Sequence, residues 1–314
     1  MSDKRLIYAI AGPTASGKTA LAVELAKRVN GEVVNFDSVQ IYREIKIATA
    51  KPTPEEMQGI PHHLIDYVDP RVNYTAADWA RDAEEKIEEI ESRRRTVVMV
   101  GGTGFYLRTL LNPLFESPKT DEELRGRLHA IRDKKGPAHL HRMLARVDGE
   151  MAAELFPRDH VRVIRALEVF FQTGERLSSR QADRLPRPEF AGRVRIFVLD
   201  PPRETLYRLI NERTERHFAG GLVDEVKRLR MAGLRDSTNA LGSHGYRRVC
   251  EYLRGERTLV KAIEKTKQDV RNYAKRQLTW FRSEPSAIWL PTFGTAPKTA
   301  ESLVAKAADK EEST

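Results

Sequence analysis

A glycine-rich segment near the N-terminus constrains the fold of this chain more than any other feature of its sequence. The motif GPTASGKT at 12–19 satisfies the pattern GxxxxGK[ST]; it directly follows the apolar run Leu6–Ala11 and precedes a helical pattern. Strand, turn and helix in this order form a P-loop, in which backbone N–H groups and the helix N-terminus surround a phosphate. We therefore expect phosphate to contact Gly12, Pro13, Thr14, Ala15, Ser16, Gly17, Lys18 and Thr19.

Two side chains of this motif have predicted roles of their own. Lys18 adds a point charge to the phosphate cradle, and the Thr19 hydroxyl is the candidate ligand for Mg²⁺. A nucleotide hydrolase would also carry an acidic residue at the end of a neighbouring strand. Here the apolar run Thr96–Val100 ends in Gly101 and Gly102 instead. Nucleotide hydrolysis is therefore not the reaction that the sequence favours.

Five apolar, β-rich runs alternate with helical patterns along the chain. They are Leu6–Ala11, Glu32–Phe36, Thr96–Val100, Val194–Leu199 and Ala287–Leu290. This alternation is typical of a parallel sheet, so we predict an α/β fold with a P-loop NTPase-like parallel sheet core. A stretch with helical patterns and no strand lies between the third and fourth runs, with prolines at both ends, and we interpret it as a helical insertion.

The predicted domains follow from these patterns. The first part of the core takes 1–112, and the helical insertion takes 113–189. The core continues over 190–292 and contains a basic C-terminal helix. Few apolar residues occur in 293–314, so we expect this tail to be disordered.

Composition narrows the class of protein. Of the 314 residues, 40% are hydrophobic and 32% are charged, which is typical of globular proteins, and no apolar run is long enough to span a bilayer. The single cysteine, Cys250, can form no disulfide within the chain. We expect a cytoplasmic protein without a cleaved leader, and a monomer by default.

Positive charge concentrates on two predicted helical faces. Nine lysines or arginines and three acidic residues fall within 254–282, in a chain whose formal net charge is +9. In the insertion, Arg162 and Arg165 lie on the face opposite an apolar stripe that contains Val163, Ile164, Leu167, Phe170 and Phe171. Basic faces of this kind favour a polyanionic partner such as nucleic acid.

Three further side chains are candidates for chemistry, each with a simpler structural alternative. Asp37 follows the second apolar run, and ligands of open α/β sheets bind at the carboxyl ends of strands, so it is the leading candidate for a general base. Asp37 and Thr103 could equally cap a turn or a helix. Arg213 lies among acidic residues of a helical pattern, where a surface ion pair explains it as well.

Seven segments in order closely resemble the bacterial tRNA dimethylallyltransferases, and the resemblance covers nearly the whole chain. The segments are GPTASGKT at 12–19, FDSVQIYR at 36–43, TAKP at 49–52, PHHLIDYVDP at 61–70, VGGTGFYL at 100–107, GLVDEV at 221–226 and YAKRQLTWFR at 273–282. The resemblance implies that a dimethylallyl group moves from dimethylallyl diphosphate to N6 of the adenosine beside the anticodon. The acceptors would be tRNAs that read codons beginning with U, with Mg²⁺ as cofactor and diphosphate as the second product.

The resemblance also implies roles for individual residues. Asp37 would take the proton from N6, Thr103 would donate to the oxygen that bridges the prenyl carbon and the diphosphate, and Arg213 would clamp the diphosphate. Contacts with tRNA would come from Asp37, Ser38, Val39, Gln40, Val161, Arg162, Val163, Ile164, Arg165, Lys275, Arg276, Gln277, Leu278, Thr279, Trp280, Phe281 and Arg282. The sequence departs from the family pattern at 243–248, where Ile-Gly-Tyr-Lys-Glu is common, and at Val161, where Gln is common.

Three alternatives remain open at the level of the sequence. An adenylate isopentenyltransferase shares the P-loop but prenylates a free nucleotide, and the helical insertion argues against it. A small-molecule kinase would bind ATP at the P-loop and use Asp37 to activate a hydroxyl. A non-enzymatic RNA-binding module would not need Asp37, Thr103 or Arg213.

Overall fold

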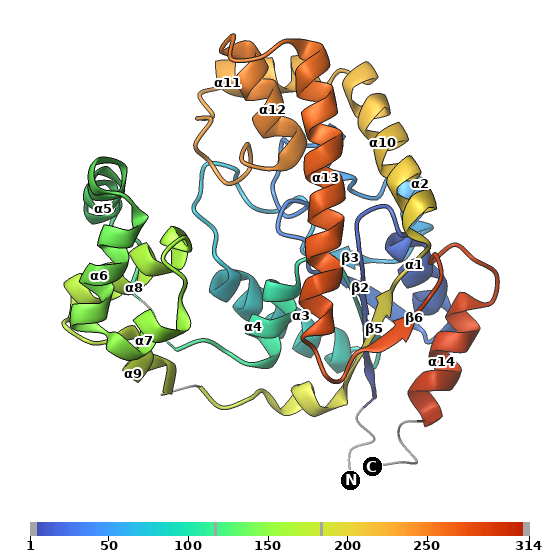
Figure 1. The fold of residues 1–314 in the computed structure, drawn as a ribbon. Helices are drawn as coiled ribbons and strands as arrows, with labels where there is room; N and C mark the ends of the chain where they lie inside the picture. Colours follow the sequence, from blue (N-terminus) through green and yellow to red (C-terminus); the bar gives the residue numbers. More distant parts are fainter. Residues whose placement is uncertain (1–4, 116–117, 183–184, 310–314) are drawn as a thin grey trace. The chain divides into compact units, whose positions relative to one another are not determined.

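The computed structural model describes residues 5–115, 118–182 and 185–309, and Figure 1 shows how they fold. The chain divides into two compact units, Met1–Leu110 with Glu189–Thr314, and Leu111–Pro188. The strands are β1 (Ile7–Ala11), β2 (Gly31–Asn35), β3 (His62–His63), β4 (Thr96–Val100), β5 (Val194–Leu199) and β6 (Ile288–Leu290).

Helices of the first unit follow the strands. They are α1 (Lys18–Arg28), η1 (Ile47–Thr49), α2 (Pro54–Met57), α3 (Ala76–Ser92), α4 (Gly104–Leu111), η2 (Glu189–Arg193), α10 (Arg203–Ala219), α11 (Leu222–Met231), α12 (His244–Leu253), α13 (Leu259–Arg282) and α14 (Thr299–Asp309). The second unit contains α5 (Glu122–Lys135), α6 (Pro137–Val147), α7 (Gly149–Glu154), α8 (His160–Thr173) and α9 (Leu177–Ala182).

The six strands form one parallel sheet in the order β3-β2-β4-β1-β5-β6, so the predicted α/β fold is confirmed. Every residue of β1, β2 and β4 is buried, as expected for central strands covered by helices on both faces. In the ladders, Ile10 of β1 pairs with Val100 of β4, and Val100 pairs with Asn35 of β2. These three strands therefore end at the same edge of the sheet, where the segments after them meet.

The helix α3 secures this edge. A capping box formed by Thr75 and Asp78 starts the helix, and the fully buried Trp79 follows in its first turn. The indole Nε1 of Trp79 donates to the backbone oxygen of Asn35 at 3.0 Å, directly before the segment that carries Asp37. The end of β2 is thus held by a side chain that is 44 residues away in the sequence.

The second unit has a hydrophobic core of its own. Leu140 and Leu144 of α6 pack with Val163, Ile164 and Leu167 of α8 in one buried cluster. The sequence placed Phe171 on the same apolar stripe, and this is wrong, because Phe171 is 49% exposed. The apolar stripe is wider than the surface that the neighbouring helices cover, so its edge stays in contact with solvent.

The expectation of a disordered tail is wrong for most of 293–314. Phe293 packs against α10, and α14 buries Ala300, Leu303 and Ala307 in the same core cluster as Leu21 and Leu25 of α1. The prediction was based on the small number of apolar residues in this segment. It failed because those few residues share one helical face. Residues 310–314 lie outside the described chain. Within the described ranges, every helix is too short or too polar to cross a membrane.

Candidate active site

The P-loop between β1 and α1 has the backbone of an anion cradle. Gly12 and Gly17 have φ values of 142° and 82°, which side chains rarely permit, and Ala15 adopts a left-handed φ of 65°. Helix α1 begins at Lys18, so its free N–H groups point into the loop. The hydroxyl of Ser16 is buried and has no hydrogen-bond partner among the described residues. A bound phosphate would supply the acceptor that this hydroxyl and the backbone N–H groups lack.

Residues after β6 contact the P-loop and support its shape. The Gly294 N–H donates to the Ser16 carbonyl oxygen at 2.8 Å. A Cβ atom at Gly294 would lie 2.3 Å from the carbonyl oxygen of Gly17, which no side chain can occupy without moving the loop. The segment that the sequence assigned to a disordered tail therefore fixes the shape of the P-loop.

Two partly buried cations lie at the cradle. The Lys18 Nζ donates to the carbonyl oxygen of Pro13 at 2.6 Å, and an Arg213 guanidinium nitrogen on α10 donates to the Thr14 hydroxyl. Burial lowers the pKa of Lys18 to about 8, although Asp37 opposes the shift. Burial likewise lowers the pKa of Arg213 to about 10, with Arg216 acting in the same direction. Apart from the electrostatic effect of Asp37, no described residue forms an ion pair with either cation, and a diphosphate would provide a partner for both.

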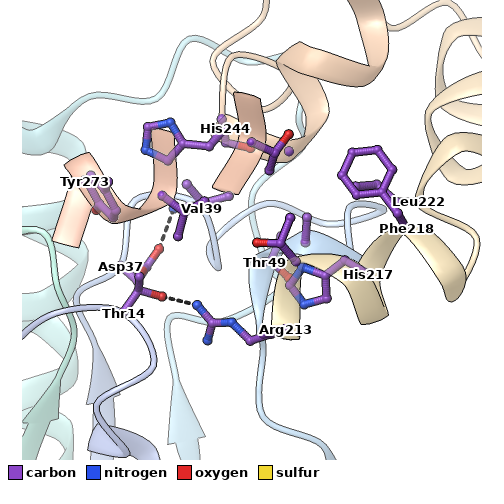
Figure 2. Close-up of a pocket in the computed structure, with 16 residues that line it drawn as sticks. Thr14, Asp37, Val39, Thr49, Arg213, His217, Phe218, Leu222, His244 and Tyr273 are labelled. Atoms are coloured by element: carbon purple, nitrogen blue, oxygen red, sulfur yellow. Dashed lines mark hydrogen bonds between the residues drawn. The ribbon is translucent and has the colours of Figure 1, made fainter. Parts of the chain in front are cut away.

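Asp37 uses one carboxylate oxygen for structure. Its Oδ1 accepts from the N–H groups of Val39 and Gln40 at 2.9 and 3.3 Å, which closes an Asx turn after β2 (Figure 2). Asp37 therefore does close a turn, as the structural alternative in the sequence analysis expected, and it uses Oδ1 for this. No described residue donates to Oδ2, so one oxygen of the carboxylate remains available for chemistry.

Thr103 lies next to the same turn. Its hydroxyl accepts from the Ser38 N–H at 3.0 Å and lies 3.2 Å from the Ser38 hydroxyl, to which it donates. Because Thr103 directly precedes α4 and Ser38 directly follows Asp37, these bonds join the ends of β4 and β2. The structure thus brings Thr103, Asp37 and Arg213 to one edge of the sheet.

A pocket opens beside these groups (Figure 2). Its lining comes from the P-loop, the segment after β2, η1 and helices α10 to α13. The residues are Thr14, Asp37, Val39, Ala48, Thr49, Arg213, Thr214, His217, Phe218, Leu222, Ser243, His244, Gly245, Thr266, Val270 and Tyr273. A diphosphate in the cradle would therefore have a partly apolar space next to it, which suits a short hydrocarbon chain.

The helix α13 holds the P-loop against the segment after β4. The Gln277 amide oxygen accepts from the Thr14 N–H at 2.9 Å, and its Nε2 donates to the Gly102 carbonyl oxygen at 3.0 Å. A Cβ atom at Gly102 or Gly104 would lie 2.0 Å from the side chain of Gln277 or Trp280, respectively, so a larger residue at either position would displace that side chain. Sequence reasoning missed this clamp, because nothing in the local pattern separates a buried glutamine from an exposed one.

Four of the residues expected to contact tRNA are buried, which corrects that part of the prediction. Val163 and Ile164 belong to the core of the second unit, with 0% and 2% exposure. Gln277 and Phe281 are buried in the first unit, with 4% and 1% exposure. Val161 is 68% exposed, as a surface contact requires. Arg162, Lys275, Arg276, Thr279 and Arg282 also lie at the surface.

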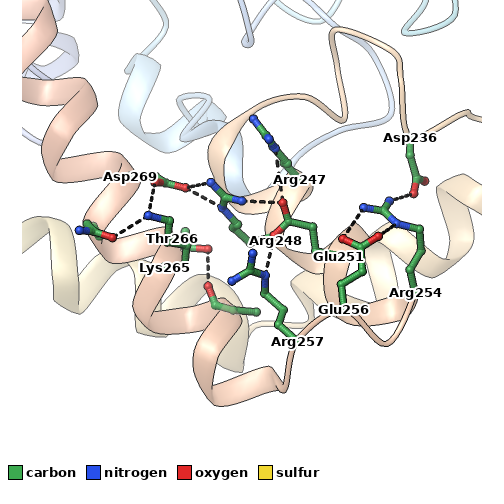
Figure 3. A network of polar contacts seen from close by, with 12 residues as sticks. Asp236, Arg247, Arg248, Glu251, Arg254, Glu256, Arg257, Lys265, Thr266 and Asp269 are labelled. Carbon is green, nitrogen blue, oxygen red and sulfur yellow. Dashed lines mark hydrogen bonds and ion pairs between the residues drawn. The ribbon is translucent and has the colours of Figure 1, made fainter. Parts of the chain in front are cut away.

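The segment 243–248, which departs from the family pattern, begins α12. Arg248 donates to Asp269 of α13 at 2.6 Å and to Glu251 at 2.5 Å (Figure 3). Glu251 also pairs with Arg257 at 2.6 Å. Arg248 is therefore part of an ion-pair network that joins α12 to α13, and this arrangement fixes the position of His244 at the start of α12.

Comparisons with known proteins agree with this geometry. A model of the IPP transferase family matches residues 40–284. The tRNA dimethylallyltransferases of Geobacter metallireducens and Myxococcus xanthus are each 47% identical, and the matches cover 92% of this chain and 93% of each relative.

Solved structures give the same result. The tRNA isopentenylpyrophosphate transferase of Bacillus halodurans has a TM-score of 0.72 at 37% identity, over 98% of this chain and 99% of that one. A eukaryotic dimethylallyltransferase acting on tRNA has a TM-score of 0.80 at 27% identity, over 98% of this chain and 79% of that one. The P-loop, the pocket beside it and these matches lead to one conclusion: the chain belongs to the IPP transferase family.

Proposed function

We propose that this enzyme is a tRNA dimethylallyltransferase. It transfers the dimethylallyl group of dimethylallyl diphosphate to N6 of the adenosine beside the anticodon, in tRNAs that read codons beginning with U, and releases diphosphate. The observation that carries the proposal is a pocket with partly apolar walls that contains Arg213 and an Asp37 carboxylate with a free oxygen, next to a phosphate cradle that contains Lys18. The names of the family's relatives support the choice of tRNA as acceptor.

The first part of the reaction depends on binding the leaving group. Lys18, Arg213 and the N–H groups of the P-loop surround the diphosphate and stabilise the negative charge that develops when the bond between C1 and oxygen breaks. The Thr103 hydroxyl donates to the bridging oxygen once it rotates away from Ser38. Since Lys18 and Arg213 are partly buried, their charges are screened less than they would be in bulk water.

The second part forms the new bond. The lone pair of N6 is delocalised into the adenine ring, so the amine is a weak nucleophile until its proton is removed. Oδ2 of Asp37 accepts this proton as the bond between N6 and C1 forms, while Oδ1 remains in the Asx turn. The turn therefore positions the base, because the two N–H groups of Val39 and Gln40 fix the plane of the carboxylate.

We propose Mg²⁺ as the cofactor. In the described part of the chain, no group of three or more His, Cys, Asp or Glu side chains could hold a metal ion. This agrees with Mg²⁺, which usually keeps several waters and binds one or two protein oxygens together with substrate phosphates. The Thr19 hydroxyl at the start of α1 is the proposed protein ligand. When bound, the ion neutralises charge on the departing diphosphate.

The acceptor adenosine has to leave its stack to reach Asp37, as bases in RNA loops do when they are recognised singly. We propose that the segment Asp37–Gln40 holds the extruded base. The exposed cations Lys275, Arg276 and Arg282 of α13 contact the RNA backbone. Val161, Arg162 and Arg165 of the second unit remain proposed RNA contacts.

The proposal is tested with two donors, dimethylallyl diphosphate and labelled ATP. The three acceptors are an anticodon stem-loop, AMP and a small molecule. Purified protein is incubated with dimethylallyl diphosphate and Mg²⁺, and either an unmodified anticodon stem-loop or AMP. We expect prenylation of the stem-loop alone. Prenylation of AMP alone would assign the chain to the adenylate isopentenyltransferases. Transfer of the γ-phosphate of labelled ATP to a small-molecule acceptor, without prenylation, would identify a kinase.

A further inference from the structure

A buried carboxylate on α11 contacts the segment that contains η1. Glu225 is 3% exposed, and its Oε1 accepts from the backbone N–H groups of Lys46 and Ile47 at 3.1 and 3.3 Å. Oε2 also accepts from the Ile47 N–H, at 3.3 Å. These N–H groups lie at the start of η1, where a helix has no acceptors of its own, and Lys46 provides no side-chain cap. Glu225 therefore caps η1 from a position 179 residues away in the sequence.

Tyr246 of α12 holds the same segment. Its hydroxyl donates to Oε1 of Glu225 and accepts from the Ala48 N–H at 3.3 Å. Burial and the neighbouring charge of Glu225 raise the pKa of Tyr246, so the hydroxyl keeps the proton that it donates. A Cβ atom at Gly245 would lie 3.1 Å from the Cβ atom of Ala48, so α12 approaches η1 closely at this point. Three successive N–H groups of 46–48 are thus bound by two side chains of α11 and α12.

The C-terminal end of η1 binds the side chain of Gln40. The Nε2 atom of Gln40 donates to the carbonyl oxygens of Thr49 and Ala50 at 3.2 and 2.8 Å. Because carbonyl oxygens only accept, the amide NH2 group has to face them, and Oε1 is left to accept from another group. No described residue donates to Oε1. Gln40 therefore presents an acceptor oxygen whose orientation depends on the position of η1.

Both Gln40 and η1 belong to the candidate active site. The Gln40 N–H donates to Oδ1 of Asp37 at 3.3 Å, and Thr49 of η1 lines the pocket (Figure 2). Burying a carboxylate is costly in free energy unless its oxygens are used. Within the described chain, Glu225 bonds to the backbone of η1 and to Tyr246, and it forms no ion pair. The buried charge therefore serves to hold η1.

We propose that Glu225 and Tyr246 are positioning residues for the RNA acceptor: they hold η1, and η1 orients Gln40 for contact with the extruded base. Both side chains are buried, with 3% and 0% exposure, so they act through η1 and not on the RNA directly. The inference rests on the proposed function and deepens it, since it assigns acceptor recognition to two further residues. The chemistry at Asp37 is unchanged. A displacement of about 1 Å at a group that positions a substrate lowers a rate by up to about 10²-fold.

The test measures the acceptor and the donor separately. The first quantity is kcat/KM for the anticodon stem-loop at saturating dimethylallyl diphosphate, and the second is the Kd of this donor without RNA. We expect Glu225→Gln to lower kcat/KM for the stem-loop by about tenfold, because one oxygen becomes a donor that faces the N–H groups of η1. The Kd of the donor should stay within about twofold, since Lys18 forms no hydrogen bond with Glu225. Asp224→Asn is the matched control on α11: this side chain is exposed and pairs with Lys227, so neither quantity should change.

A cycle of single and double variants tests the route through Gln40. The variant Gln40→Ala removes the oriented side chain and keeps the backbone N–H that donates to Asp37. In this background, Glu225→Gln should lower kcat/KM for the stem-loop by less than about threefold, against about tenfold in the native protein. Tyr246→Phe removes only the hydroxyl, and its effect should depend on Gln40 in the same way.

The outcomes separate the inference from the proposed function. A native enzyme that prenylates no stem-loop would contradict the proposed function itself. Native kcat/KM for the stem-loop in both Glu225→Gln and Tyr246→Phe would overturn the inference. So would a loss that is equal with and without the Gln40 side chain, because Glu225 would then act on the fold in general. Thermal unfolding of each variant shows whether its fold is intact, and Tyr246→Phe provides the same test if Glu225→Gln does not fold.

Discussion

At the scale of single residues, the two oxygens of Asp37 separate structure from chemistry. Oδ1 closes the turn after β2, and Oδ2 is free to take a proton. In Asp37→Asn, the amide oxygen can still accept from Val39 and Gln40, but the base is lost. We expect the transfer rate to fall by about 10²-fold to 10⁴-fold, with little change in the melting temperature. Single-turnover transfer to the stem-loop measures this, and full activity in this variant would exclude Asp37 as the base.

Lys18 predicts a pH dependence of donor binding. Its pKa in the empty protein is lowered to about 8, so above this pH the cradle loses a positive charge that the diphosphate needs. The KM for dimethylallyl diphosphate should therefore rise with increasing pH above 8, by up to about tenfold per pH unit. Lys18→Arg keeps its charge over this range and should show a flatter profile. A native KM that is constant from pH 7 to 10 would contradict a required Lys18 charge.

Some residues of the site could be predicted from the sequence, and others could not. The P-loop could be predicted because its motif is local and its chemistry demands fixed residue types. Asp37 and Thr103 were identified by their positions after strands, but their mutual contact through Ser38 depends on the pairing of β2 with β4. His217 and His244 could not be found, because the pocket that they line is formed by helices that are remote in the sequence.

At the scale of elements, α14 is the clearest departure from expectation. Leu303 is fully buried against α1, and the segment before α14 supports the P-loop through Gly294. We expect Leu303→Ala to lower the free energy of unfolding by about 2 to 5 kcal/mol, as measured by urea denaturation. Val304→Ala is the matched control, because this residue is only partly buried and should cost less. Equal stability of the native protein and Leu303→Ala would mean that α14 is not docked.

Five of the six strands in the described chain were predicted closely, since buried parallel strands are continuous apolar runs, but β3 has only two residues and was missed. The buried face of α13 could not be predicted from hydrophobicity. This face contains Ala262, Thr266, Ala274 and Gln277 along with Phe281, so small and polar residues form most of it. Hydrophobicity alone cannot reveal a face that is buried through hydrogen bonds and close helix contacts.

At the scale of the whole molecule, the excess of positive charge predicts how tRNA binding responds to salt. Lys275 and Arg282 are exposed on α13, near the end that lies at the P-loop. If each neutralises one phosphate, the double variant Lys275→Gln/Arg282→Gln should reduce the slope of log binding constant against log salt by about 2. Arg81→Gln/Lys86→Gln removes the same charge from α3 and should leave the slope unchanged. Equal slopes for the native protein and the α13 variant would exclude these two contacts.

The central claim is that N6 of an adenosine in the anticodon loop receives the prenyl group. The most direct measurement uses two stem-loops that differ only at the adenosine beside the anticodon, which in one of them is replaced by purine riboside without the N6 amino group. Each is incubated with the enzyme, dimethylallyl diphosphate and Mg²⁺, and its nucleosides are analysed by mass spectrometry. We predict a prenylated adenosine from the first stem-loop and no prenylated nucleoside from the second. Prenylation of both stem-loops, or of neither, would contradict the account.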